Sequence, residues 1–350
     1  MCSHINKPCM VWCYRMTLIS VIVPCYNEQN TIQLLLSALN GQTFPRDRME
    51  IIIADGMSTD HTREEIKAFR NEHSEISIRV IDNEKRTIPA GLNKAIAASE
   101  GEYIVRLDAH SMPDREYVQR CLEALKQGKG DNVGGIWDIQ PGDRSATARS
   151  IAIAASHPLG VGDARYRYTD QAGYVDTVPF GAFRKNLIDR IGPYDETLLT
   201  NEDYEFNSRI RKSGGKVWLD PAIHSIYFAR STFSALAKQY WRYGYWKAKM
   251  LRRYPGTLRW RQALPPLFVL SLIVLGVASF IFQPVLWLFG LELLIYLLAL
   301  MAVSLEIVLK KRDFGVLLSV PAAIATMHLA WGSAFIWSTC QGLIKKRDHP

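Results

Sequence analysis

The chain has 350 residues, 48% of them hydrophobic, and six cysteines that form no paired framework. This length suffices for one α/β domain and a smaller second part, and it excludes a small fold held together by disulfides. The net charge of +8 is concentrated between Arg242 and Arg261, before an apolar C-terminal third, which indicates the cytoplasmic flank of a membrane segment and not a nucleic-acid-binding face.

Residues 1–16 hold three of the cysteines but no apolar run of the kind that a signal peptide requires. We expect these residues to form a disordered leader. The alternative is a metal site at His4, Cys9 and Cys13, which we disfavour.

Residues 17–137 alternate short runs rich in Ile and Val with longer segments of helical spacing. The apolar runs predict buried parallel strands at 18–23, 50–54, 78–81, 103–107 and 133–137. The segments between them predict helices at 31–39, 62–72, 90–98 and 115–126. This alternation predicts an α/β fold with a doubly wound, mostly parallel sheet.

Acidic and polar residues follow the predicted strands. Asp55 ends the second strand, Asp82 the third, and Asp108 and His110 follow the fourth. Ligands of doubly wound sheets bind beyond the carboxyl ends of the strands. If the chain stays extended after the fourth strand, Asp108 and His110 point the same way and can hold a divalent cation that also binds phosphate oxygens. The alternative is that Asp108 only caps the next helix.

The regular alternation stops after residue 137. Glu202 and Asp203 open a helical stretch at 204–212, where acidic residues are also simply favoured by the positive end of a helix. Residues 231–262 interleave aromatic and cationic side chains, a mixture that suits the headgroup layer of a bilayer. An aromatic helix packed on the preceding domain is the alternative.

An apolar region occupies residues 263–344. From Leu264 to Leu309 only Glu292 and Glu306 are ionisable. One helix over that stretch would be about 69 Å long, whereas a bilayer core is about 30 Å thick, so we expect two helices joined near Gln283. A third apolar run follows at 314–344. We favour three membrane spans. They would put the basic tail at 345–350 on the non-cytoplasmic side, against the positive-inside tendency. The alternative is a last segment that is re-entrant or lies in the membrane interface.

Several motifs occur in a fixed order and resemble the GT-A catalytic domain of family 2 of inverting glycosyltransferases over residues 18–212. They are Pro-x-Tyr-Asn-Glu at 24–28, Asp-Gly-x-Ser-x-Asp at 55–60, Gly-Leu-Asn at 91–93, Asp-Ala-His at 108–110, Gly-Ala-Phe-Arg at 181–184, Gly-Pro-Tyr-Asp-Glu at 192–196 and Glu-Asp at 202–203. The Asp-Ala-His variant and the short membrane region are similar to the glucosyltransferases of succinoglycan-type exopolysaccharide assembly.

The resemblance implies a role for each matching residue. Asp203 would be the catalytic base, with Glu202 as the rival, and Asp108 and His110 would hold the divalent cation, Mn²⁺ or Mg²⁺. The nucleotide-sugar contacts would be Pro24, Tyr26, Glu28, Asp55, Arg86, Asn93 and Asp108. The acceptor contacts would be Gly181, Ala182, Phe183, Gln239 and Arg242.

Two departures from the family pattern and one further resemblance bear on these assignments. His110 replaces a usual Asp, which leaves the choice of metal open. Ala54 precedes Asp55 where the family has a second acid. Residues 239–243 resemble the Gln-x-x-Arg-Trp signature of processive polysaccharide synthases, with Tyr243 in place of the Trp.

These patterns predict a cytoplasmic-membrane enzyme with its catalytic domain at 17–230 facing the cytoplasm. It would transfer a sugar, glucose from UDP-glucose being favoured, onto a lipid-linked oligosaccharide in exopolysaccharide synthesis, one sugar per acceptor. Its partners would be the UDP-sugar, the lipid-linked acceptor and the membrane, with no nucleic acid. The alternatives are a processive synthase, a polyprenyl-phosphate sugar synthase and a catalytically inert nucleotide-sugar sensor or scaffold.

Overall fold

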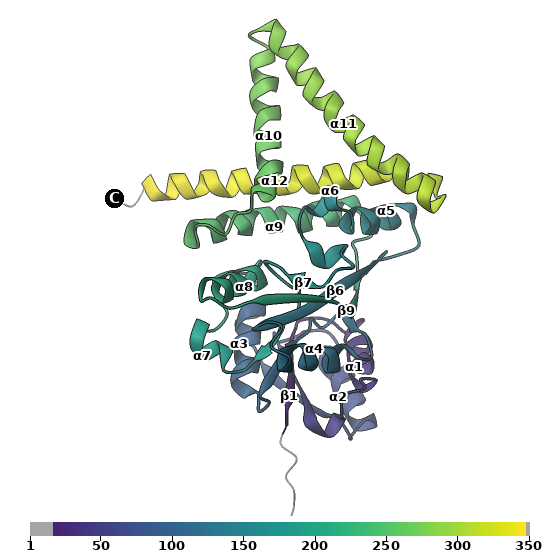
Figure 1. The fold of residues 1–350 in the computed structure, drawn as a ribbon, viewed down its shortest axis with the longest axis vertical. Coiled ribbons are helices and arrows are strands. Elements are labelled where there is room, and N and C mark those ends of the chain that lie inside the picture. Colours follow the sequence, from purple (N-terminus) through teal and green to yellow (C-terminus); the bar gives the residue numbers. More distant parts are fainter. Residues whose placement is uncertain (1–16, 348–350) are drawn as a thin grey trace, which may run out of the picture.

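The computed structural model describes residues 17–347. The predicted leader at 1–16 and residues 348–350 of the basic tail lie outside the described residues. Figure 1 shows an α/β unit at the base, a layer formed by two long helices above it, and a helical hairpin that projects away from both.

The α/β unit is built on one mixed sheet with the order β3-β2-β1-β4-β8-β6-β9-β5, and β7 pairs with β9 at the side. The pairs among β1, β2, β3 and β4 are parallel, as is β6 with β9, whereas β8 runs antiparallel to both β4 and β6. The strands are β1 Ile19–Cys25, β2 Met49–Asp55, β3 Ser77–Asp82, β4 Tyr103–Arg106, β5 Met112–Pro113, β6 Asn132–Gln140, β7 Gly173–Tyr174, β8 Ala182–Arg184 and β9 Val217–Phe228. All five strands expected from the apolar runs are present.

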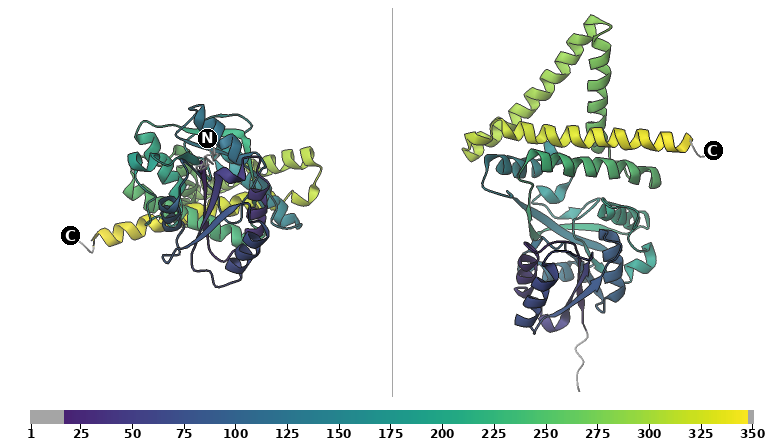
Figure 2. Two further views of the ribbon diagram at one scale, coloured as in Figure 1. Left: turned by 90° about the horizontal axis from the view of Figure 1, so that it is seen from below. Right: turned by 180° about the vertical axis from the view of Figure 1, so that it is seen from behind.

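Helices connect the strands and cover both faces of the sheet (Figure 2). In the α/β unit they are α1 Ile32–Asn40, α2 Thr62–Glu72, α3 Ile88–Ala98, α4 Tyr117–Lys126, α5 Ala146–Ala155, α6 Pro158–Val161, α7 Leu187–Ile191 and α8 Glu202–Lys212. Short 3₁₀ turns lie at Arg46–Arg48, Arg165–Arg167 and Phe314–Val316. Because side chains alternate across each strand, β1 contributes Val21 to the core on one face and Ile22 to the core on the other.

The predicted aromatic and basic segment is a helix, α9 Phe233–Arg253, and α12 Ser319–Arg347 lies along it (Figure 1). Gly244 permits the close approach of the two helices, because a Cβ atom there would lie 2.1 Å from the carbonyl oxygen of Trp331. A third apolar core, which includes Ile151 and Met327, joins these helices to α5. The layer of α9 and α12 is therefore fixed to the α/β unit.

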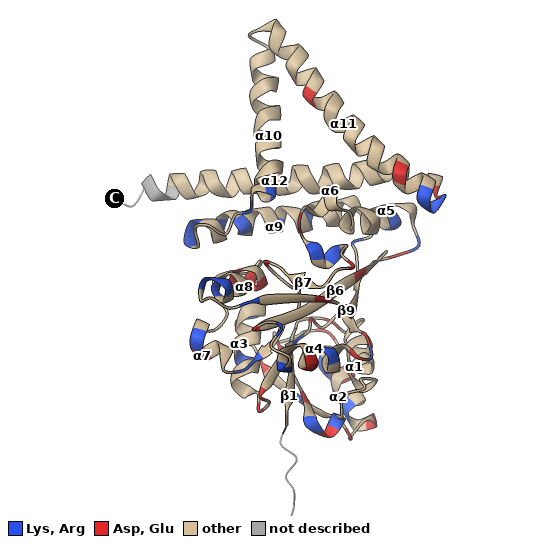
Figure 3. Ribbon diagram, viewed as in Figure 1, with Lys and Arg blue, Asp and Glu red and all other residues tan. Residues whose placement is uncertain are grey.

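The projecting hairpin consists of α10 Trp260–Ser279 and α11 Gln283–Lys311. Together with 314–344 these helices are long and apolar enough to cross a membrane, and side chains at the tip such as Phe280 are 93% exposed. The third apolar helix, α12, however, lies across α10 and not beside it (Figures 1 and 2). Figure 3 shows cations near the base of the hairpin, in α9 and at the end of α11, as well as in α7 and α8 of the α/β unit.

Candidate active site

A buried arginine holds the acidic residues of the site together. Arg106, at the end of β4, is 2% exposed and forms ion pairs with Asp203, with Glu202 at 3.0 Å and with Asp108 at 3.2 Å. Burial opposes the charge of this guanidinium, but Asp108 and Glu202 outweigh that effect and raise its pKa. The strand that ends at Arg106 thus brings the predicted metal ligand and both predicted catalytic acids into one cluster.

Asp203 is the more accessible of the two acids at the start of α8. Its side chain is 29% exposed, against 9% for Glu202. Asn201, the residue before them, is the N-cap of α8 and has a left-handed backbone conformation with φ of 67°. At this residue the chain changes direction from the preceding loop into the helix. An incoming hydroxyl group can therefore reach the Asp203 carboxylate more easily than that of Glu202.

The loops after β1, β2 and β3 are held by their own side chains. Asp55 is fully buried; its carboxylate accepts hydrogen bonds from the Ser58 hydroxyl at 2.5 Å and from Nε of Arg63 at 2.6 Å. Arg63 also pairs with Asp82 at 2.6 Å. Asp55 therefore holds the loop after β2 in place, whereas Tyr26, directly after β1, is 45% exposed.

The other predicted nucleotide-sugar contacts lie around the same strand ends. Pro24 is buried within β1, and Arg86 is exposed after β3 with φ of 55°. The Asn93 amide donates to the Tyr194 carbonyl at 2.9 Å and to Glu196 at 3.0 Å, so it holds the 192–196 loop in place. Left-handed non-glycine residues recur in these loops, at Asn27, Met57 and Arg86. Such conformations cost free energy and persist where the surrounding contacts impose them.

The predicted metal ligands occupy a turn and not an extended segment. β4 ends at Arg106, and the turn is closed by hydrogen bonds from Ser111 to the carbonyl of Asp108. The condition set for Asp108 and His110, that the chain stays extended after the fourth strand, is therefore not met. Nδ1 of His110 donates to Glu28 at 3.0 Å instead, a bond that raises the pKa of His110.

These residues still fit a cation that takes most of its ligands from phosphate. No group of three or more acidic, His or Cys side chains is arranged as a metal site within residues 17–347. Asp108 is 21% exposed and His110 47% exposed, so each has a free face toward the site. One or two protein ligands are usual for Mg²⁺-type ions that bind together with substrate phosphates.

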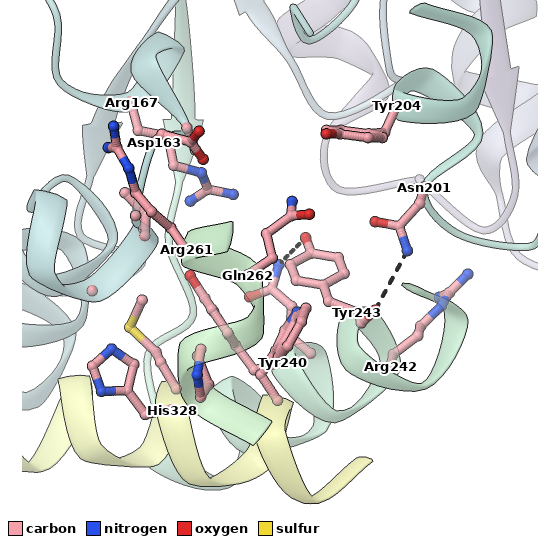
Figure 4. A pocket seen from close by; sticks show the side chains of 18 of the residues that line it. Asp163, Arg167, Asn201, Tyr204, Tyr240, Arg242, Tyr243, Arg261, Gln262 and His328 are labelled. Atoms are coloured by element: carbon pink, nitrogen blue, oxygen red, sulfur yellow. Dashed lines mark hydrogen bonds between the residues drawn. The ribbon is translucent and has the colours of Figure 1, made fainter. Parts of the chain in front are cut away.

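A large cavity of about 1520 Å³ extends from this cluster to the hairpin. Figure 4 shows part of its lining, including Arg167, Arg242 and Tyr243. We call it the α9 cavity. Arg106, Asp108 and Asp203 line one end, and Glu292 and Tyr296 of α11 line the other. Drug-sized ligand sites have volumes of about 300–1,000 Å³, so the α9 cavity has room for a large or elongated molecule.

The structure does not support the predicted acceptor contacts of Gly181, which precedes β8, and of Ala182 and Phe183 in β8. The side chains of Ala182 and Phe183 are fully buried in the core, and a Cβ atom at Gly181 would lie 2.1 Å from Asn132. These residues do not line the α9 cavity, whereas Phe180, just before them, does. The motif is therefore explained by close packing of β8 between β4 and β6.

The two predicted acceptor residues in α9 do line the cavity. Arg242 donates to the hydroxyl of Thr200 and to the carbonyl of Leu199, both at 2.7 Å, and so ties α9 to the loop that precedes Asp203. Gln239 donates to the hydroxyls of Tyr227 and Tyr243, both at 2.9 Å. The motif at 239–243 thus connects the acidic cluster to the helical layer.

Two buried arginines of the site were not assigned from the sequence. Arg106 stands at the end of an apolar strand, and only its place beside Asp108 could have drawn attention to it. Arg167 belongs to no motif; it is 8% exposed and lines the α9 cavity.

The chain is similar in sequence to proteins that transfer sugars. The family described as "Glycosyl transferase family 2" matches residues 20–192. A dolichyl N-acetyl-alpha-D-glucosaminyl phosphate 3-beta-D-2,3-diacetamido-2,3-dideoxy-beta-D-glucuronosyltransferase from Methanococcus voltae is 27% identical over 94% of this chain and 98% of its own length. The succinoglycan biosynthesis protein ExoA from Rhizobium meliloti is 28% identical over 90% of this chain and 93% of its own length.

The fold also matches a solved structure over most of its length. A mannosyltransferase from Pyrobaculum calidifontis, solved in complex with GDP-Man and Mn²⁺, superimposes with a TM-score of 0.55 and 18% identity. The match covers 91% of this chain and 88% of that one. It extends the likeness in fold beyond the matched residues 20–192 into the C-terminal helices.

Proposed function

Because the chain belongs to glycosyl transferase family 2, we propose that it is a membrane-anchored, inverting enzyme that transfers one sugar from a nucleotide-sugar donor to a lipid-linked acceptor. The observation that carries this proposal is the continuity of the α9 cavity. It joins the acidic cluster at Arg106 to an exposed apolar hairpin, so a lipid-linked hydroxyl group has a path to Asp203.

Asp203 acts as the general base. Inversion requires the acceptor hydroxyl to lose its proton as its oxygen attacks the anomeric carbon from the face opposite the leaving nucleotide. A positioned base contributes typically about 10²–10⁴-fold to such a step. Arg106 holds Asp203 and Glu202 in place, and Asp203 is the more exposed of the two.

The donor lies over the ends of β1 to β4, with Tyr26 beside the base and Asp108 and His110 nearest the diphosphate. Asp108 and His110 would hold a divalent cation, which neutralises charge on a diphosphate leaving group when it is bound. The mannosyltransferase of similar fold was solved with Mn²⁺, which supports this choice. A UDP-sugar, with glucose favoured, remains the proposed donor.

The acceptor is a lipid-linked saccharide. The two relatives that match along almost their whole length are named for a dolichyl-phosphate-linked sugar and for succinoglycan biosynthesis. The poly-beta-1,6-N-acetyl-D-glucosamine synthase of Staphylococcus epidermidis, by contrast, is matched over only 52% of its length. This difference favours single transfer to a lipid-linked acceptor, as in the assembly of an exopolysaccharide unit, over processive synthesis.

Two helices, α10 and α11, cross the membrane, and α12 lies in its surface. α10 is 20 residues and so about 30 Å long, which equals the thickness of a bilayer core. Since α12 lies across α10, it cannot run parallel to the same bilayer normal. Arg259 precedes α10 and Lys311 ends α11, so cations flank both ends of the hairpin. By the positive-inside rule this supports a cytoplasmic position for the α/β unit.

The proposal is tested by measuring nucleotide release from purified protein in detergent. A panel of UDP- and GDP-sugars is offered with Mn²⁺, Mg²⁺ or chelator, with and without a lipid extract. We expect release that needs both the extract and a divalent cation. Nucleotide binding without release under any of these conditions would contradict the proposal and favour a sensor. Replacing the six native cysteines by serine and introducing one cysteine at Ile281 tests the topology: in sealed inside-out vesicles we expect no labelling of this variant by an impermeant thiol reagent.

A further inference from the structure

Arg167 is a buried cation without an acidic partner. Among residues 17–347, no carboxylate lies within 4.0 Å of its guanidinium. Its hydrogen bonds are long, 3.4 Å to the Tyr166 hydroxyl and 3.5 Å to the Ala155 carbonyl. A buried charge is costly unless an opposite charge or good hydrogen bonds accompany it. Arg106, in the same cavity, has three carboxylates, so the two arginines differ sharply.

Aromatic rings supply part of the compensation. The guanidinium lies 4.9 Å from the ring centroid of Trp137 and 5.9 Å from that of Tyr227, and these two rings stack on each other at 4.4 Å. Cation–π contacts of this kind offset only part of the cost of burying an ion. The rings fix the position of Arg167 but leave its charge without a counterion.

The polar groups around Arg167 can donate hydrogen bonds but lack acceptors. The hydroxyl oxygen of Tyr166 accepts from Arg167, and those of Tyr227 and Tyr243 accept from Gln239. No acceptor for the three hydroxyl protons is found within residues 17–347. A guanidinium and several O–H groups without acceptors form an environment that suits an anion with several oxygens.

We propose that Arg167, with the hydroxyls of Tyr166, Tyr227 and Tyr243, binds a phosphate group of the lipid-linked acceptor. The inference rests on the proposed function and names the chemistry that the acceptor must carry: a phosphate or diphosphate joined to an apolar chain. Arg167 lines the same cavity as Leu267, Phe268 and Val274 of α10, which offer an apolar path for that chain into the bilayer.

A phosphate site benefits from both the positive charge and the planar, forked guanidinium group of arginine. Arginine presents five N–H donors in one plane and binds phosphate through two of them at once, which lysine cannot do. The phosphate held there would stand between the hairpin and the acidic cluster, so the sugar linked to it points toward Asp203. Arg167 is thus a binding residue for the acceptor, with no role in holding the donor.

The test measures binding of a short-chain prenyl phosphate to the full-length protein in detergent by calorimetry. The matching prenol, inorganic phosphate and UDP are titrated in parallel. The variants are Arg167→Met and Arg167→Lys, with Arg165→Met as the control, since Arg165 belongs to the same 3₁₀ turn but does not line the cavity. We expect wild-type protein to bind the phosphate at least about tenfold more tightly than the prenol or inorganic phosphate.

Arg167→Met should lose that preference, Arg167→Lys should keep only part of it, and Arg165→Met should retain it. UDP affinity should be equal in all four proteins. Equal affinity of the wild type for prenyl phosphate and prenol would overturn the inference even if the variants failed to fold. So would loss of UDP binding in Arg167→Met with prenyl phosphate binding intact. Prenyl phosphate binding without sugar transfer to any acceptor would instead overturn the proposed function alone.

Discussion

The strand-end loops and the part of the α9 cavity around Arg167 differ in whether their charged side chains have partners of opposite charge. After β2 and β3, Asp55, Arg63 and Asp82 pair with one another, and the loops are complete without a ligand. In the cavity, Arg167 and Lys238 have no carboxylate partner among residues 17–347. The strand-end loops therefore need no ligand to balance their charges, whereas the proposed acceptor phosphate would supply a counterion to the buried Arg167.

The acidic cluster lies where the two regions meet, and removing its base has the largest expected effect. In Asp203→Asn, we expect the transfer rate to fall by about 10²–10⁴-fold because the acceptor hydroxyl loses its proton acceptor. The donor affinity should stay within a few-fold of wild type, since the strand-end loops are intact. Steady-state rates and UDP titrations check both statements. Glu202→Gln is the comparison, and a wild-type rate in Asp203→Asn with loss in Glu202→Gln would move the base to Glu202.

Substitution of Arg106 tests whether its buried ion pairs with the acidic cluster stabilise the folded protein. We expect Arg106→Met to destabilise the fold by about 3–5 kcal/mol, because the substitution leaves Asp108, Glu202 and Asp203 facing one another around an apolar side chain. The measurement is the thermal midpoint in detergent. Arg46→Met is the matched control: the Arg46–Glu75 pair is about half exposed and should contribute only about 0–1 kcal/mol. Equal losses in the two variants would refute the special role of the buried arginine.

Substitution of Gly244 tests the packing of α9, which lines the α9 cavity, against α12. A methyl group in Gly244→Ala would strike the backbone of Trp331, so α9 and α12 must separate at a cost of about 1–3 kcal/mol. We expect a lower thermal midpoint and weaker use of the lipid acceptor, with UDP affinity unchanged. Gly290→Ala is the control, because a Cβ atom at Gly290 meets nothing within 4 Å. A thermal midpoint equal to that of the control would contradict this packing.

Lys247 gives the smallest expected effect, a dependence of stability on pH. Burial lowers its pKa to about 7 in the fold, whereas an unfolded lysine titrates near 10.5. Between these values the unfolded chain binds more protons, so this contribution to stability increases as the pH rises. We expect wild-type protein to gain about 1–2 kcal/mol relative to Lys247→Met between pH 7 and pH 9. Parallel stability profiles of the two proteins would show that Lys247 keeps its proton in the fold.

Much of the α/β unit could be predicted from the sequence because its strands are continuous apolar runs. The expected strand at 50–54 lies within β2, and the expected helix at 62–72 coincides with α2. Asp108 and Asp203 were also assigned, since they carry motif positions. Their contact through Arg106 was not, because the sequence alone does not say which strand end faces the start of α8.

The remaining misses have physical causes. Hydropathy measures how apolar a helix is but carries no direction, so the sequence left open whether the third apolar run spans the membrane or lies in its interface; in the fold α12 lies along α9. Gly181, Ala182 and Phe183 were assigned to the acceptor, yet Gly181 packs closely against Asn132 and the other two side chains are buried in the core. Arg167 was missed because what distinguishes it is burial without a carboxylate partner among residues 17–347, and neither property can be read from the sequence.

The most direct test of the account follows a labelled sugar from the nucleotide donor into products separated by solvent extraction. Wild-type protein with a lipid extract should place the label in the lipid fraction, with one sugar added per acceptor molecule. Asp203→Asn should leave the label in the nucleotide. Label in a long, water-soluble polymer, or no transfer despite donor binding, would contradict single transfer to a lipid-linked acceptor.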